Sequence, residues 1–196
     1  MPAIAPILEN PETTPHPAPP AGLLPAPRPR ILLADDDASI RESLGKLLRN
    51  SGYEITSAAD GQEAIEQFDA GQTNLVLLDL QMPNKSGWDA FERVTAANPL
   101  VPVIIITGRS SQYKRALAAG VGALLEKPLD IPFLLQTIQA LLTEPPEARL
   151  RRIAGQESSF RFASPDPELF REMLRLAYTT PYRCSSGASP RWGPKE

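Results

Sequence analysis

Short apolar runs alternate with longer amphipathic stretches between Arg30 and about Leu142. A short apolar run predicts a buried strand, whereas apolar residues three or four positions apart predict one face of a helix. The run Val103–Ile106 is continuously apolar, as is typical of a parallel strand covered on both faces. We expect strands at 31–34, 53–57, 75–78, 103–106 and 123–125, and helices at 39–50, after Asp60, and at 88–97, 113–119 and 131–142. Five such repeats predict an α/β fold with a doubly wound, five-stranded parallel sheet.

The chain divides into three parts by composition. Prolines recur every few residues in 1–29, which predicts a disordered leader, with binding to a proline-recognising partner as the alternative. The α/β domain is expected at 30–143. In the extension, 144–196, Glu144-Pro145-Pro146 ends the last helix of the domain. We expect a short helix at 148–155, a second at 167–178 with an apolar stripe, and a disordered tail at 185–190. The stripe is expected to pack on the domain or on a second copy of the chain, in preference to lipid.

Composition excludes several classes of function. No apolar stretch approaches the roughly 20 residues that cross a bilayer, and the amino terminus does not resemble a secretory signal. A net charge of −3 gives no field that attracts nucleic acid, and acidic and basic side chains are interspersed after Leu142. Cys184 is the single cysteine, which fits a reducing cytoplasm. His16 is the single histidine, so a histidine-dependent triad or multi-histidine metal site is excluded within one chain.

Charged and hydroxyl side chains follow the predicted strands at the point where each strand ends. Asp35-Asp36-Asp37 follows the first strand and Asp79 ends the third, while Thr107 and Lys127 follow the fourth and fifth. Carboxyl ends of parallel strands share one edge of a sheet, so these side chains should converge. Neighbouring carboxylates repel one another but suit a small, hard cation such as Mg²⁺. Asp37 is expected to be the N-cap of the first helix.

Four segments resemble the signatures of the response-regulator receiver domain of the CheY-like superfamily. They are Ile31-Leu32-Leu33-Ala34-Asp35-Asp36-Asp37, Leu77-Leu78-Asp79-Leu80-Gln81-Met82-Pro83 followed by Gly87, Ile106-Thr107-Gly108, and Glu126-Lys127-Pro128. The resemblance covers about 30–142. It implies a flavodoxin-like fold with strand order 2-1-3-4-5.

The resemblance also implies a role for each position at the strand ends. Asp79 would accept a phosphoryl group from a histidine kinase, which is nucleophilic catalysis by a carboxylate. Mg²⁺ would be bound by Asp36, by Asp79 and by the backbone carbonyl of Gln81, with Asp35 acting through water. The cation would offset the repulsion between the acids and the incoming phosphate.

Further residues would surround the phosphoryl group. Thr107 would donate a hydrogen bond to one oxygen, and Lys127 would pair with another, its turn fixed by Pro128 with a cis bond. Gly108 would leave room for the phosphoryl group. By the same resemblance, Gln81 and Arg109 would tune the lifetime of the phosphorylated state.

One position departs from the receiver pattern. Many receivers carry Tyr or Phe three residues before the lysine, and this chain has Leu124 there. An aliphatic side chain can fill the space but cannot reproduce a two-position aromatic switch. The departure weakens the expected relay from the site to the fourth helix and fifth strand.

Other classes of function fit the residues less well. Phosphohydrolases of the haloacid dehalogenase type place a second acid two residues after the nucleophile, where this chain has Gln81, and their acidic pair comes last in the chain. A dinucleotide-binding enzyme would need a Gly-rich turn where Asp35-Asp36-Asp37 stands. A degenerate receiver normally lacks the acceptor, the acid pair or the lysine, all of which are present.

The sequence thus predicts a cytoplasmic response regulator of a two-component or phosphorelay pathway. Its expected partners are a histidine kinase or phosphotransfer protein, a downstream protein target and, in a homodimer, a second copy of the chain. No nucleic acid, no membrane and no separate catalytic output domain are expected. The alternative function is a receiver-like adaptor that binds its partners without phosphorylation.

Overall fold

The computed structural model describes residues 27–156 and 160–166. Residues 1–26 of the predicted leader, the predicted helix at 167–178 and the predicted tail at 185–190 lie outside the described residues. The strands are β1 (Arg30–Ala34), β2 (Glu54–Ala58), β3 (Thr73–Asp79), β4 (Val103–Thr107), β5 (Ala123–Glu126) and β6 (Arg161–Ala163). The helices are α1 (Ala38–Asn50), α2 (Gly61–Gln67), α3 (Gly87–Ala97), α4 (Tyr113–Ala118), α5 (Ile131–Leu142) and α6 (Pro146–Ile153), with a short 3-10 helix η1 (Ser110–Gln112).

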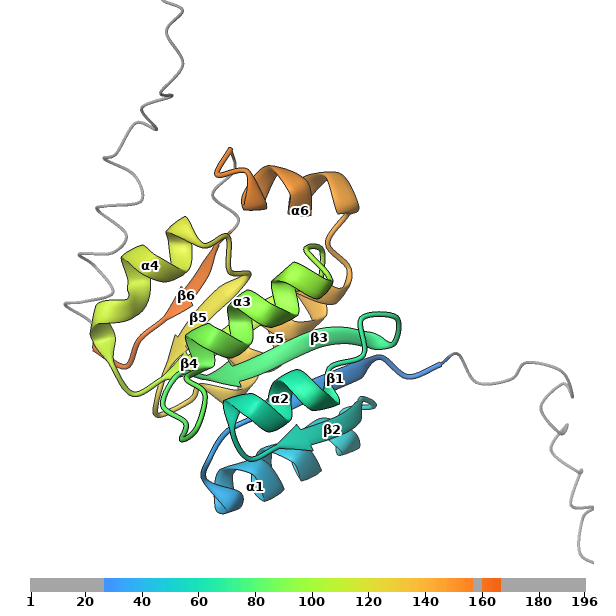
Figure 1. The fold of residues 1–196 in the computed structure, drawn as a ribbon, viewed down its shortest axis with the longest axis vertical. Coiled ribbons are helices and arrows are strands. Elements are labelled where there is room, and N and C mark those ends of the chain that lie inside the picture. Colours follow the sequence, from blue (N-terminus) through green and yellow to red (C-terminus); the bar gives the residue numbers. More distant parts are fainter. Residues whose placement is uncertain (1–26, 157–159, 167–196) are drawn as a thin grey trace, which may run out of the picture.

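The strands form one parallel sheet in the order β2-β1-β3-β4-β5-β6 (Figure 1). The predicted α/β class and the order of the first five strands are confirmed. β1 and β3, which carry the acidic residues, are neighbours near the centre of the sheet, with Ala34 opposite Leu78. The order therefore brings Asp35 and Asp79 together although they lie 44 positions apart in the chain.

Helices cover both faces of the sheet. One core lies between the sheet and α2, α3 and α4, and includes Val76 and Leu78 of β3. The other lies between the sheet and α1 and α5, and includes Leu75 and Leu77 of the same strand. Successive side chains of a strand point to opposite faces, so a strand that is covered on both faces must be apolar throughout. This is the physical reason for the apolar runs that end in Asp35 and Asp79.

Aspartates begin three of the helices at the carboxyl edge of the sheet. The carboxylate of Asp37 accepts a hydrogen bond from the Ser39 amide at 2.8 Å, which confirms the predicted N-cap of α1. Asp60 accepts from the Glu63 amide at 2.8 Å and begins α2. Asp130 begins α5 in the same way. These caps satisfy amides that have no partner within the helix.

The extension beyond α5 differs from the prediction. The expected short helix at 148–155 is present as Pro146–Ile153, two residues earlier, with proline in its first turn. A sixth strand, β6, was not predicted. Its three residues are too few to show a period, and one of them is an exposed arginine. None of the helices among the described residues is long and apolar enough to span a lipid bilayer.

Candidate functional site

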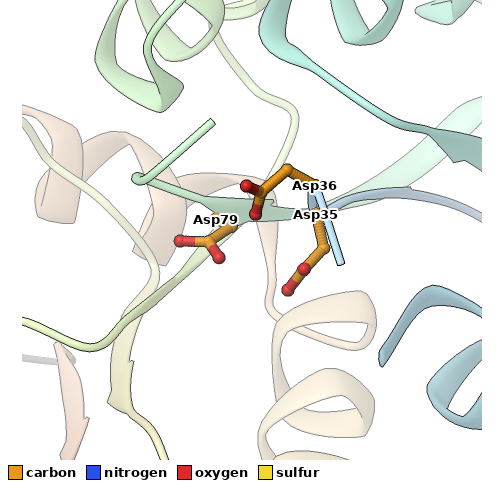
Figure 2. Close-up of side chains that lie close together, drawn as sticks. All are labelled: Asp35, Asp36 and Asp79. Carbon is orange, nitrogen blue, oxygen red and sulfur yellow. The ribbon is translucent and has the colours of Figure 1, made fainter. Parts of the chain in front are cut away.

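Three carboxylates converge at the carboxyl ends of β1 and β3. Asp35 and Asp36 follow β1, and Asp79 is the last residue of β3. One oxygen of each lies within 4.8 Å of one oxygen of each of the others. Figure 2 shows the carboxylate of Asp36 turned toward Asp79, with that of Asp35 pointing away from Asp36. Asp35 and Asp79 are buried, whereas Asp36 is exposed, so the cluster is open on the Asp36 side.

Among residues 27–156 and 160–166, one ammonium group lies within this cluster. The Nζ atom of Lys127 is 2.9 Å from Asp35 Oδ2 and 2.5 Å from Asp79 Oδ2. The Lys127 amide donates to the Thr107 carbonyl at 2.8 Å, which ties the lysine to the end of β4. The Lys127–Pro128 bond is cis, as the receiver resemblance implies. With three carboxylates and one ammonium, the cluster carries excess negative charge.

The environment shifts the titration of both central groups. Burial raises the pKa of Asp79, and the nearby charge of Asp35 raises it further, against hydrogen bonds from the Gln81 amide and from Lys127. Burial alone would lower the pKa of Lys127, but its hydrogen bonds to Asp79 and Asp35 hold that pKa above the usual value. Lys127 is therefore stabilised in its protonated form. Ionisation of Asp79 is disfavoured unless further positive charge lies beside it.

These side chains fit a hard divalent cation. Asp36 and Asp79 supply oxygen ligands from facing carboxylates, which is the donor type that Mg²⁺ prefers. The Gln81 amide donates to Asp79 Oδ1 at 2.9 Å, so the backbone at 81 lies beside the same carboxylate. When bound, the cation would offset negative charge between the carboxylates and a phosphoryl oxygen. Asp37 is engaged in capping α1 and lies outside this acidic cluster.

Two glycines keep the surroundings of Asp79 open. A Cβ atom on Gly87 would lie 2.1 Å from the Asp79 carbonyl oxygen, so only glycine fits there. A Cβ atom on Gly108 would lie 3.2 Å from Gln81 Oε1. A larger residue at position 108 would therefore crowd the Gln81 side chain. The exposed side chains of Gln81 and Arg109 lie beside Gly108. Glycine at these two positions therefore places no side chain against the Asp79 backbone or the Gln81 side chain.

Thr107 and Leu124 lie in the core beside the site. Thr107 is fully buried, and its Oγ1 accepts a hydrogen bond from the Arg109 amide at 3.1 Å. Leu124 is also fully buried, in the core that contains Tyr113 of α4. Thus the position that often carries an aromatic ring in receivers is filled here by an aliphatic side chain with no exposed surface.

Several residues near the site were missed in the sequence. Arg41 of α1 donates from Nη1 to the Asp35 carbonyl at 2.6 Å and so stabilises the turn between β1 and α1. Glu126 is a buried carboxylate just before Lys127, and it accepts a hydrogen bond from Ser164 beside β6. A charge at the end of a short apolar strand was the only available signal for Glu126. Trp88 of α3 is 8% exposed and donates from Nε1 to Gln112 Oε1 at 3.1 Å.

Comparison with curated proteins finds response regulators. Over 131 residues, the chain is 37% identical to the transcriptional regulatory protein PdtaR of Mycobacterium tuberculosis, covering 65% of this chain and 61% of that protein. Over 152 residues, it is 34% identical to the response regulator MprA of Mycolicibacterium vanbaalenii, covering 74% and 63%. The chain therefore spans less than two thirds of the length of these relatives.

Comparison with solved structures finds receiver domains. The non-phosphorylated HemR receiver domain of Leptospira biflexa matches with a TM-score of 0.58 and 25% identity, over 60% of this chain and 97% of that one. The response regulator TrrA of Thermotoga maritima, solved in complex with Mg²⁺ and BeF, matches with a TM-score of 0.52 and 32% identity, over 58% and 98%. The family model of the response regulator receiver domain matches residues 31–139. This chain belongs to the response-regulator receiver domain family.

Proposed function

We propose that the chain is a phosphorylated response regulator in which Asp79 is the acceptor. The observation that carries the proposal is the contact of Lys127 with Asp35 and Asp79 in a cluster of three carboxylates. Such a cluster has excess negative charge for a cation and an ammonium group for a phosphoryl oxygen. The Mg²⁺ ligands are Asp36, Asp79 and the Gln81 carbonyl, with Asp35 acting through water.

In the proposed reaction an Asp79 carboxylate oxygen attacks the phosphorus of a phosphohistidine in a kinase or phosphotransfer protein. A P–O bond to Asp79 forms and the P–N bond breaks. The imidazole leaves with the bonding electrons, and because its other ring nitrogen carries a proton, it leaves as a neutral ring. Lys127 and the Thr107 hydroxyl contact phosphoryl oxygens, and Gln81 and Arg109 set access of water to the product. We propose no catalysis beyond phosphorylation and dephosphorylation of Asp79 itself.

We further propose that the output is contact with a protein target or a second copy of the chain. The described part of the extension mixes Arg149 and Arg152 with Glu144, and these side chains are paired with one another. Their charges therefore form no basic stripe for phosphates. Salt-dependent, sequence-specific binding of duplex DNA by the phosphorylated chain would contradict this output.

The phosphorylation step is tested by the mass of the intact chain after incubation with Mg²⁺ and acetyl phosphate. The wild type should gain one phosphoryl group and Asp79→Asn none. The matched control is Asp37→Asn, which changes a neighbouring acid that caps α1 and should be modified like the wild type. An unchanged adduct in Asp79→Asn would refute the assignment.

The second candidate is an adaptor that works without phosphorylation. The fully buried Leu124 favours it, because the usual aromatic switch is absent. The same mass measurement separates the two functions, since an adaptor of this kind needs no adduct on Asp79.

A further inference from the structure

The free edge of β5 is covered by a segment from the extension. Residues Phe160–Ser164, here called the edge segment, contain β6, which runs parallel to β5 (Figure 1). Leu124 lies opposite Phe162, and the Arg161 amide donates to the Gly122 carbonyl at 3.3 Å. An edge strand offers unpaired backbone groups to any extended chain, and here the chain itself takes that place.

Aromatic contacts give the covered edge its specificity. Tyr113 of α4 makes edge-to-face contacts with Phe160 and with Phe162, at ring centroid distances of 5.4 and 5.2 Å. The two phenylalanines also pack on the core that contains Leu124. The surface thus fits an extended segment with aromatic side chains two positions apart.

The far end of the edge segment is hydrogen-bonded to Glu126, the residue that precedes Lys127. The Ser164 hydroxyl donates to Glu126 Oε2, and the other oxygen of that carboxylate has no hydrogen-bond partner among the described residues. Glu126 is 7% exposed, lies opposite Thr107 in the β4–β5 register and directly precedes Lys127. A buried carboxylate held through one oxygen is sensitive to any shift of its strand.

Helix α6 makes its own hydrogen bonds to the loops before β4 and β5. Arg152 donates from Nη1 to the Gly120 carbonyl at 2.6 Å, and Arg149 donates from Nη1 to the Leu100 carbonyl at 2.7 Å. These contacts lie at the amino ends of the strands, away from Asp79. Neither hydrogen bond involves the edge segment, so detachment of that segment from β5 would not break them.

We propose that the edge segment is an intramolecular ligand of the α4–β5 edge, and that loading the Asp79 site weakens its hold and exposes this surface. This inference rests on the proposed function. A phosphoryl group on Asp79 gives Lys127 and Thr107 new oxygen partners. Their displacement shifts Glu126, which adjoins Lys127 and faces Thr107, and so disturbs the hydrogen bond from Ser164. The coupling is reciprocal, because a weaker edge segment must then favour the loaded site.

The first test measures amide hydrogen exchange of the full chain with Mg²⁺, with and without beryllofluoride, a reversible stand-in for the phosphoryl group. We expect exchange across 161–163 to quicken about tenfold on loading, within the usual range of such couplings. Asp79→Asn should show no change. Unchanged or slower exchange in the loaded wild type overturns the inference, while an acetyl phosphate adduct on the same protein would leave the proposed function standing.

The second test measures the apparent Kd for beryllofluoride at saturating Mg²⁺. Ser164→Ala removes the hydrogen bond to Glu126 and should bind about fivefold more tightly than the wild type. The matched control is Arg161→Ala, which truncates an exposed side chain of the same edge segment and should leave the Kd unchanged. Equal affinities of Ser164→Ala and the wild type overturn the coupling. Failure of the wild type to bind beryllofluoride, with no acetyl phosphate adduct, rejects both proposals.

Discussion

Two clusters of charged side chains in this domain differ in how their charges are paired. At the carboxyl ends of the strands, Asp35, Asp36 and Asp79 lie close together, and the ammonium group of Lys127 contacts Asp35 and Asp79. At the junction of α5 and α6, Glu144 is shared by Arg149 and Arg152. The first cluster has more acids than bases and the second has more bases than acids.

In the second cluster, backbone carbonyls accept hydrogen bonds from the arginine donors that do not bind Glu144. Arg152 donates to both oxygens of Glu144, from Nε at 3.2 Å and from Nη2 at 2.8 Å, and its third nitrogen, Nη1, donates to the Gly120 carbonyl. Arg149 binds the Leu100 and Leu141 carbonyls. Burial would raise the pKa of Glu144, but the hydrogen bonds and charges of Arg152 and Arg149 hold it below the usual value.

The difference separates a structural cluster from a binding site. At Glu144 the pairing favours the ionised acid, so the cluster stabilises the fold as it stands. At Asp79 burial and the neighbouring acid favour the protonated form, so a bound cation would stabilise the ionised carboxylate. The Asp79 cluster has surplus negative charge, whereas the acid of the Glu144 cluster is fully paired. This difference indicates that the Asp79 cluster is the one that binds a ligand.

The largest expected effect is on the Glu144 cluster. Arg152→Ala leaves Glu144 with one guanidinium in a largely buried setting and should lower the free energy of unfolding by about 3 kcal/mol. Urea denaturation followed by circular dichroism measures this loss. The control is Lys46→Ala, on the exposed surface of α1, which should change stability by less than about 0.5 kcal/mol. Equal, small losses in both variants would mean that α6 contributes little to the fold.

The acidic cluster could be predicted from the sequence, but the Glu144 cluster and the strand β6 could not, for physical reasons. The acids at the ends of β1 and β3 stand out because buried apolar runs precede them, and Asp37 could be assigned to the N-cap from its position before α1. No local pattern marks Glu144 as the partner of Arg152, since pairing across a helix junction depends on the approach angle of α6. The strand β6 could not be foreseen because its pairing with β5 is set by Tyr113 and Glu126, which are distant in sequence.

A smaller effect is expected on cation binding at the open cluster. Asp36→Asn removes one charge that faces Asp79 and should weaken Mg²⁺ binding about tenfold or more. Isothermal titration calorimetry gives the Kd, with the fluorescence of the nearby Trp88 as a second signal. Asp37→Asn keeps a capping side chain on α1 and should bind Mg²⁺ like the wild type. A comparable loss of Mg²⁺ affinity in Asp36→Asn and Asp37→Asn would show that the three adjacent acids attract the cation only through their total charge and do not bind it directly.

The smallest effect concerns the stability of the metal-free protein. Because the pKa of Asp79 is raised in the folded state, the folded chain binds this proton more tightly than the unfolded chain. The protonated form contributes stability that is complete below the unfolded pKa of about 3.9 and is lost as pH rises through the raised folded pKa. Asp79→Asn removes the titration, so in EDTA at pH 7 it should be more stable than the wild type.

After solvent screening we expect a gain on the order of 1 kcal/mol, or roughly 2–4 °C in Tm. Scanning calorimetry at pH 7 and near pH 4 measures it, and the gain should shrink at the lower pH, where Asp79 in the wild type holds its proton. Saturating Mg²⁺ should reverse the order at pH 7, because the cation binds the folded wild type more tightly than the variant. A loss of stability at pH 7 in EDTA would instead make Asp79 a paired structural acid of the same kind as Glu144.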